Sequence, residues 1–228
     1  MPRKPIRVSE NYIPNEYEIE DTDKISQQQL NNTKVYSSRE EYVKTLKQNI
    51  RYMEVGVAWG YYSELVAKHC NPELIDLVDW YNQDLKCWSW RKFGECQCTP
   101  KHILEYDAEN HEEYVKNKFA QYNNVTTIKG DAREVLKNIN KKYDYVYIDI
   151  TNNRHVTKTV LDICSKLIDK NGIIGLNDYL IYDGIIEDMP YGTFQTVNEF
   201  LSKNKNWYVN AIALHNLGFY DIYIRKES

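Results

Sequence analysis

A strand followed by a glycine turn and a helix, over residues 50–70, most constrains the fold of this chain. Residues 50–55 are mostly apolar, Gly56 and Gly60 bracket a short turn, and residues 61–70 have the apolar spacing of a helix. A strand, a glycine turn and a helix start together let the backbone approach a ligand closely. The stretch therefore predicts one strand–helix unit of an α/β domain, with a ligand site at its turn.

The spacing of the glycines distinguishes between nucleotide ligands. A dinucleotide fingerprint has three glycines as G-x-G-x-x-G, with an acidic residue about 20 residues later. Here the pattern is E-x-G-x-x-x-G from Glu54 to Gly60, and Ala58 stands where a middle glycine would be. This spacing disfavours an NAD-dependent enzyme.

Strand-like and helix-like segments alternate along the rest of the chain. Further strands are expected at residues 74–79, 125–129, 143–150, 172–178, 207–214 and 219–224. The last two are adjacent, as in a hairpin. We expect an α/β fold with a doubly wound, mostly parallel seven-stranded sheet and an antiparallel terminal β-hairpin strand.

The chain is expected to consist of an arm and one domain. Residues 1–36 show little periodicity and contain three prolines. They predict an N-terminal arm that lies across the domain, joins two copies in a homo-oligomer, or is a loose terminus. Residues 37–228 are expected to form the domain, and the irregular, aromatic segment 80–109 is expected to be a lid-like insertion.

Composition limits the classes of protein. The chain is 42% hydrophobic and 27% charged, its net charge is −4, and it has five cysteines. No apolar run approaches the ~20 residues of a membrane span. An odd cysteine number fits a reducing cytoplasm better than a disulfide framework. We expect a cytoplasmic enzyme or binding protein without a membrane partner, and the negative charge disfavours nucleic acid.

Acidic residues recur at the ends of the expected strands. They are Glu54, Asp79, Asp131, Asp149 and Asp178. In doubly wound sheets the ligand binds beyond the carboxyl ends of the strands. Acids at five successive ends would form an edge that fits a cationic ligand better than a pyrophosphate.

The glycine turn and these acids resemble the class I S-adenosylmethionine-dependent methyltransferases, over roughly residues 38–226. Within that family the chain is similar to the small-molecule and saccharide-type branch. The resemblance implies a Rossmann-like methyltransferase fold and S-adenosylmethionine as cofactor. It implies that the cofactor's amino-acid part is flanked by Glu54, Gly56 and Gly60, its ribose by Asp79, and its adenine by Trp80, Asp131 and Ala132.

The expected reaction is methyl transfer to a small-molecule or sugar acceptor, at oxygen. The alternatives are methylation of a protein or nucleic acid, and a non-catalytic nucleotide-binding or scaffold domain. A base that removes the acceptor's proton is typical of such chemistry, and the candidates are Asp149, Asp178 and His215. Asp149 could instead hold the methionine ammonium or cap a helix, and His215 could be a solvent-exposed hairpin residue.

A metal is not expected at the site. Catechol-type relatives bind a divalent metal through an acid at the fourth strand end and Asp-Asn at the fifth, but Tyr179 follows Asp178 here. Two oxygen ligands and waters could still hold Mg²⁺, yet we expect activity to survive EDTA. A second set of possible metal ligands lies in and just after the segment 80–109, at Cys87, Cys96, Cys98, His102 and His111. This set lacks the C-x₂-C spacing of structural zinc sites. A substrate lid is therefore favoured there over a metal site.

Overall fold

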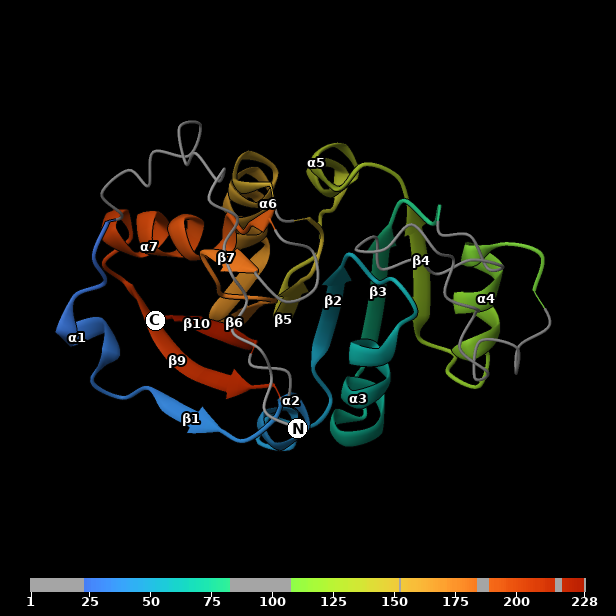
Figure 1. The fold of residues 1–228 in the computed structure, drawn as a ribbon. Coiled ribbons are helices and arrows are strands. Elements are labelled where there is room, and N and C mark those ends of the chain that lie inside the picture. Colours follow the sequence, from blue (N-terminus) through green and yellow to red (C-terminus); the bar gives the residue numbers. More distant parts are fainter. Residues whose placement is uncertain (1–22, 83–107, 152, 184–188, 216–218, 228) are drawn as a thin grey trace, which may run out of the picture.

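The computed structural model describes residues 23–82, 108–151, 153–183, 189–215 and 219–227. These residues form an eight-stranded sheet between two layers of helices (Figure 1). The strand order is β1-β9-β10-β6-β5-β2-β3-β4. In that order the strands are Lys34–Tyr36, Trp207–Leu214, Tyr220–Lys226, Ile168–Leu176, Tyr143–Ile148, Arg51–Val55, Leu74–Asp79 and Val125–Lys129.

The strands β6, β5, β2, β3 and β4 run parallel to one another. Val55 at the end of β2 lies between Val78 of β3 and Ile148 of β5. All three side chains are buried. Central parallel strands are covered on both faces, so they consist of nearly continuous apolar runs. Because these five strands are parallel, their carboxyl ends meet at one edge of the sheet.

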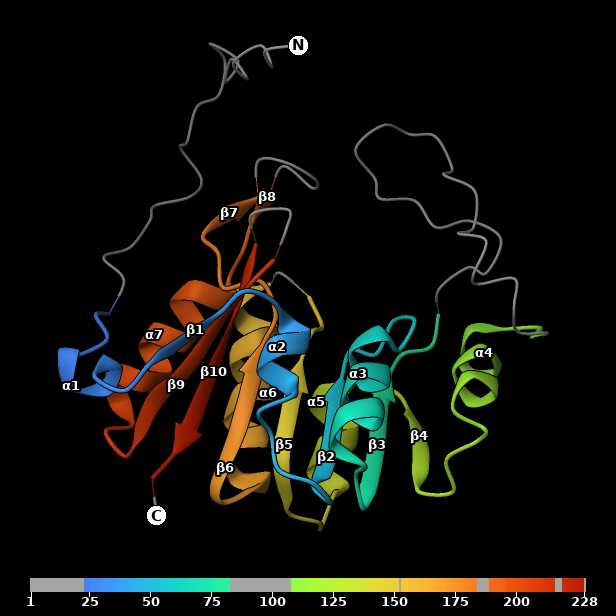
Figure 2. The same cartoon turned by 90° about the horizontal axis from the view of Figure 1, so that it is seen from below.

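The helices cover both faces of the sheet, as expected for a doubly wound fold (Figures 1 and 2). The helices α2 (Arg39–Val43), α3 (Tyr61–Cys70) and α4 (His111–Lys118) pack into the core of one face. The helices α5 (Ala132–Val135), α6 (Arg154–Leu167) and α7 (Thr193–Lys203) pack into the core of the other. Polar side chains at Ser38, Asn110 and Asn153 cap α2, α4 and α6.

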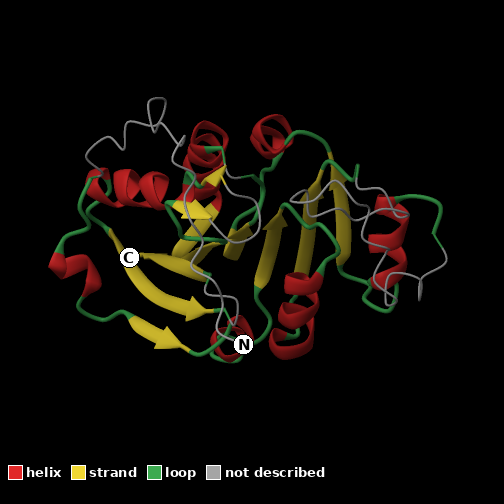
Figure 3. Cartoon of the chain, viewed as in Figure 1, coloured by secondary structure: helices red, strands yellow, loops and turns green. Residues whose placement is uncertain are grey.

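The last two strands form the expected antiparallel hairpin. β10 pairs antiparallel with both β9 and β6, and Ile222 lies opposite Ile212 on one side and Leu176 on the other. A second, two-stranded sheet joins β7 (Tyr182–Asp183) to β8 (Met189–Pro190). The strands and helices are distinguished by colour in Figure 3.

The main sheet has eight strands, so the expected number of seven is wrong. The additional strand is β1, which pairs parallel with β9 at the edge of the sheet. It has only three residues, and Val35 is 67% exposed, so no apolar pattern marks it. Before β1, the side chain of Gln29 on α1 (Gln27–Leu30) donates hydrogen bonds to the carbonyls of Leu201 and Trp207.

Several expectations fall on parts of the chain outside the described residues. They concern residues 1–22 of the arm, most of the lid-like insertion, and the metal candidates Cys87, Cys96, Cys98 and His102. The arm's boundary and its part in a homo-oligomer therefore stay predictions. Within the described ranges, no helix has the length and apolar character to cross a membrane.

Candidate functional site

The glycine turn after β2 has an unusual backbone and almost no free space. Gly56, Ala58 and Gly60 have positive φ angles of 87°, 44° and 70°. A Cβ atom at Gly56 would lie 1.8 Å from the carbonyl oxygen of Asp149. Glycine adopts such angles without strain, whereas alanine does so at a cost. The turn therefore packs directly against the end of β5, which only a glycine at position 56 permits.

Asp79 ties the end of β3 to this turn. Its Oδ2 accepts hydrogen bonds from the backbone N–H groups of Val57 and Ala58, at 2.7 and 3.0 Å. Its Oδ1 accepts one from the N–H of Tyr81 at 2.8 Å. A carboxylate has about four acceptor positions, so Asp79 can hold the turn and still accept from a ligand hydroxyl.

Glu54 lies beneath the turn and is 2% exposed. Its carboxyl group accepts hydrogen bonds from the hydroxyls of Ser63 and Tyr52. Burial raises the pKa of Glu54 to about 8, since a charged carboxylate loses its hydration there. Glu54 is therefore mainly protonated at neutral pH and bonded within the core, and its expected part in holding the cofactor stays a prediction.

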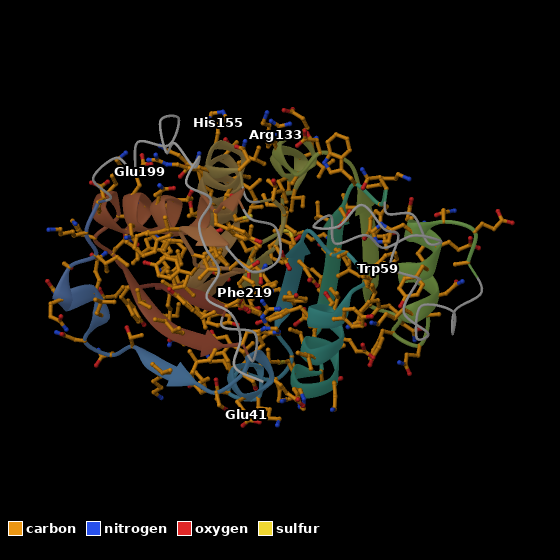
Figure 4. The ribbon with its side chains drawn as sticks, in the orientation of Figure 1. Glu41, Trp59, Arg133, His155, Glu199 and Phe219 are labelled. Atoms are coloured by element: carbon orange, nitrogen blue, oxygen red, sulfur yellow. The ribbon has the colours of Figure 1, made fainter. Side chains whose placement is uncertain are left out.

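The ends of β3 and β4 carry the remaining candidates for cofactor binding. Trp80, directly after Asp79, is 57% exposed, which is unusual for a tryptophan. Asp131 caps α5 by accepting the N–H of Arg133 at 2.9 Å. The Arg133 guanidinium (Figure 4) also pairs with this carboxylate at 2.5 Å and lowers its pKa. Ala132 is buried at the first turn of α5.

Two acids and an amide line a hollow beyond the ends of β5 and β6. The amide of Asn177 donates to Asp149 Oδ1 at 2.9 Å. Asp149 opens to solvent at this hollow. The protein packed around it nevertheless removes hydration and raises its pKa to about 6. Burial and the neighbouring charge of Asp149 raise the pKa of Asp178 to about 7.

A family model described as "Methyltransferase domain" matches residues 53–179. The match covers more than half of the chain and contains the glycine turn and all five strand-end acids. The chain belongs to this methyltransferase family. A search of the curated proteins found no match to the sequence.

Solved structures show the same fold in other methyltransferases. The O-methyltransferase TomG from Streptomyces achromogenes, determined with SAM, is 13% identical, with a TM-score of 0.56 over 94% of this chain and 86% of that one. An rRNA methylase from Streptococcus thermophilus is 8% identical, with a TM-score of 0.54 over 83% and 94%. Precorrin-6y C5,15-methyltransferase from Geobacter metallireducens is 13% identical, with a TM-score of 0.52 over 82% and 85%. The neighbours thus differ in their acceptors.

The methyltransferase also has a polar network that the sequence analysis missed. Arg39 of α2 contacts both carboxylate oxygens of Asp221 on β10, at 2.7 and 2.9 Å. It also donates to Asn177 Oδ1, and it lies 3.9 Å from Asp178. The Tyr147 hydroxyl donates to Asp221 at 2.8 Å, and its oxygen lies 3.2 Å from Asn177 Oδ1.

This network orients the side chain that faces Asp149. Because Arg39 donates to Oδ1 of Asn177, the Nδ2 group of Asn177 is directed to Asp149. One signal in the sequence could have revealed the network. Asp221 interrupts the apolar run of the last strand, and a charge within a buried strand requires a partner.

The third base candidate of the methyltransferase, His215, lies in the connection after β9. Its backbone N–H donates to the carbonyl of Phe219 at 2.8 Å. Burial and the positive charge of Arg39 lower the pKa of His215, so the ring is neutral at neutral pH. The structure thus brings Asp149 and Asp178 to one hollow, which His215 does not line.

Tyr179, which replaces a metal-ligand position of the catechol-type relatives, turns away from the hollow of the methyltransferase. Its hydroxyl donates to Asn198 Oδ1 of α7 at 2.5 Å, and the side chain is buried. In the part of the chain that the structure describes, no group of three or more His, Cys, Asp or Glu residues could hold a metal ion. Metal-independent activity stays a prediction.

Proposed function

We propose that this protein transfers the methyl group of S-adenosylmethionine to a hydroxyl oxygen of a small molecule, and that sugars are among its candidate acceptors. One contact carries the proposal. The glycine turn, where backbone can approach a cofactor, packs through Gly56 directly on Asp149, which lines the acidic hollow. A cofactor at the turn and an acceptor in the hollow would therefore be neighbours.

The residues at the turn fit this cofactor. Gly56 and Gly60 allow the left-handed backbone of the turn, Asp79 keeps one acceptor position for a ribose hydroxyl, and Trp80 offers an exposed ring for adenine. Asp131 and Ala132 are at the next strand end, as adenine contacts would require. The solved TomG structure with SAM supports the same choice of cofactor. The bound cofactor would supply an electrophilic methyl group on a positively charged sulfur.

The chain's own contribution is to position the acceptor and remove its proton. Positioning alone can supply up to ~7–11 kcal/mol of the barrier. We assign the base to Asp149, which is held by Asn177 at 2.9 Å and opens on the hollow. The Asp149 carboxylate would accept the hydroxyl proton while the acceptor oxygen would take the methyl group from the cofactor's sulfur, which would keep the bonding electrons. The positive charge on sulfur is thereby lost.

Replacing Asp149 with asparagine should reduce kcat by about 10²–10⁴-fold, the usual contribution of a base. Asparagine keeps the oxygen that accepts from Asn177, so cofactor affinity should change little. In the unmodified protein the base works only when unprotonated. Turnover should therefore rise with pH through the pKa values of about 6 and 7 of Asp149 and Asp178, and then level off. A pH profile of kcat for both proteins measures this.

Three parallel variants make the assignment specific. Asp178→Asn and His215→Gln remove the other candidates, and Asp162→Asn changes an exposed carboxylate on α6 as a control. We expect the largest loss of kcat, together with the loss of the pH-dependent rise, in Asp149→Asn. A larger loss in Asp178→Asn or His215→Gln would move the base to that residue.

Binding and transfer assays test the function itself. Titration calorimetry should show one molecule of S-adenosylhomocysteine bound per chain and no binding of NAD. Labelled methyl groups from S-adenosylmethionine should appear in the low-mass fraction of a cell extract. The described lining of the hollow has two carboxylates and no lysine or arginine, which disfavours a nucleic-acid acceptor. Label in RNA or protein would overturn the acceptor class, and binding without transfer would indicate a non-catalytic domain.

We also infer a cytoplasmic location. The odd number of cysteines supports it, and Cys70 and Cys164 are free, buried thiols. Such thiols persist in a reducing compartment.

A further inference from the structure

Helix α4 binds carbonyl groups of the glycine turn, whereas Asp79 binds its N–H groups. Nε2 of His111, at the first residue of α4, is 2.5 Å from the carbonyl oxygen of Ala58. Nζ of Lys118, at the last residue of α4, donates to the carbonyl oxygen of Trp59 at 3.1 Å. His111 is 1% exposed and Lys118 is 7% exposed. Both ends of one helix therefore bind successive carbonyls of the turn.

The chemistry of both side chains suits this contact. Burial lowers the pKa of His111, so its ring is neutral at neutral pH. A carbonyl only accepts hydrogen bonds, so the ring must carry its hydrogen on Nε2. The ring also packs against Trp59, with centroids 4.9 Å apart. The buried charge of Lys118 is balanced by Glu64 at 2.9 Å, and its ammonium lies over the Tyr61 ring at 4.3 Å.

Ala58 is the residue that needs these bonds. Its φ of 44° is left-handed, which is unfavourable for a residue with a Cβ. Its N–H donates to Asp79 Oδ2 and its carbonyl accepts from His111. Both polar groups of this strained residue are thus held, the N–H by the end of β3 and the carbonyl by α4. Strained backbone persists only where its surroundings determine it in this way.

We propose that His111 and Lys118 are positioning residues for the cofactor, because they hold the turn in its binding conformation before the cofactor arrives. This inference rests on the proposed function, in which the turn binds S-adenosylmethionine. Neither side chain is required to touch the cofactor. A preorganised turn binds more tightly because less conformational freedom is lost on binding.

The test compares S-adenosylhomocysteine affinity in His111→Phe, in Ala58→Gly and in the double variant. Phenylalanine keeps a ring against Trp59 but lacks the donor to the Ala58 carbonyl. His111→Phe should weaken binding about tenfold, the scale of one hydrogen bond. In the double variant glycine adopts the left-handed angle without strain. It should regain most of the lost affinity, whereas Ala58→Gly alone should change it less than about threefold.

Lys118→Met gives a second test that does not depend on the histidine, and it should also weaken binding. Its matched control is Lys141→Met. Lys141 pairs with the buried Asp76 at 2.8 Å on β3 but does not contact the turn. The control should lower the melting temperature and leave the affinity unchanged, which separates positioning from general stability.

Two results would overturn the inference. One is wild-type affinity in both His111→Phe and Lys118→Met. The other is a loss in His111→Phe that Ala58→Gly does not restore, with equal losses in Lys141→Met. If the unmodified protein binds no S-adenosylhomocysteine, the proposed function fails, and the inference fails with it.

Discussion

Replacing Gly56 with alanine is expected to abolish cofactor binding and to lower the free energy of unfolding by roughly 3 kcal/mol or more. The added Cβ would lie 1.8 Å from the carbonyl oxygen of Asp149 and 2.4 Å from its carbonyl carbon. Backbone cannot rotate away as a side chain can, so β2 and β5 would have to separate at the cofactor edge. Overpacking costs typically 1–3 kcal/mol, and the left-handed φ of 87° adds about 1–2 kcal/mol.

Gly60→Ala provides a graded comparison. Its φ of 70° is also left-handed, but the new Cβ would meet the ring of Phe119 at 2.7 Å rather than backbone. A ring can shift, so the loss of stability and of S-adenosylhomocysteine affinity should be smaller. Urea unfolding and calorimetry of both variants measure these effects. A folded Gly56→Ala that binds like the unmodified protein would contradict the position of the cofactor at this turn.

Replacing Asp79 with alanine should have the second largest effect on binding. The change removes the acceptor for the N–H groups of Val57, Ala58 and Tyr81. It also removes the expected partner of the ribose hydroxyls. Hydrogen bonds to charged groups contribute about 1.5–3 kcal/mol, so affinity for S-adenosylhomocysteine should fall by at least about tenfold.

The matched control is Asp144→Ala. Asp144 lies at the amino-terminal end of β5, at the other end of the strands from the expected cofactor site. Asp144 also accepts a backbone N–H, from Arg51 at 2.9 Å, and pairs with the Arg51 guanidinium. Its loss should therefore disturb a similar local structure without touching the cofactor edge. Unchanged affinity in a folded Asp79→Ala, or an equal loss in Asp144→Ala, would remove Asp79 from the cofactor site.

The parallel strands could be predicted because their signal is local. The apolar run of β5, the glycine turn after β2 and the acids at the strand ends are all visible within a few residues of sequence. Parallel strands with helical crossovers place those ends at one edge. The sequence thus predicted that Asp79 and Asp149 share an edge, although not that Asp79 ties down the turn.

What the sequence did not predict depends on contacts between distant residues. β1 is a short, exposed strand that exists because β9 offers it a pairing edge. Arg39, Asn177 and Asp221 come from three separate parts of the chain and meet only in the fold. The burial of Glu54 is similar, because its carboxyl group is bonded to Ser63 of α3, on the far side of the turn. Local periodicity carries no information about such partners.

The most direct test of the account is a crystal structure of the protein with S-adenosylhomocysteine. We expect the ligand along the glycine turn, with a ribose hydroxyl hydrogen-bonded to Asp79, its adenine beside Trp80 and Ala132, and its sulfur directed to the hollow at Asp149. A ligand bound elsewhere, or a ribose without contact to Asp79, would contradict the account.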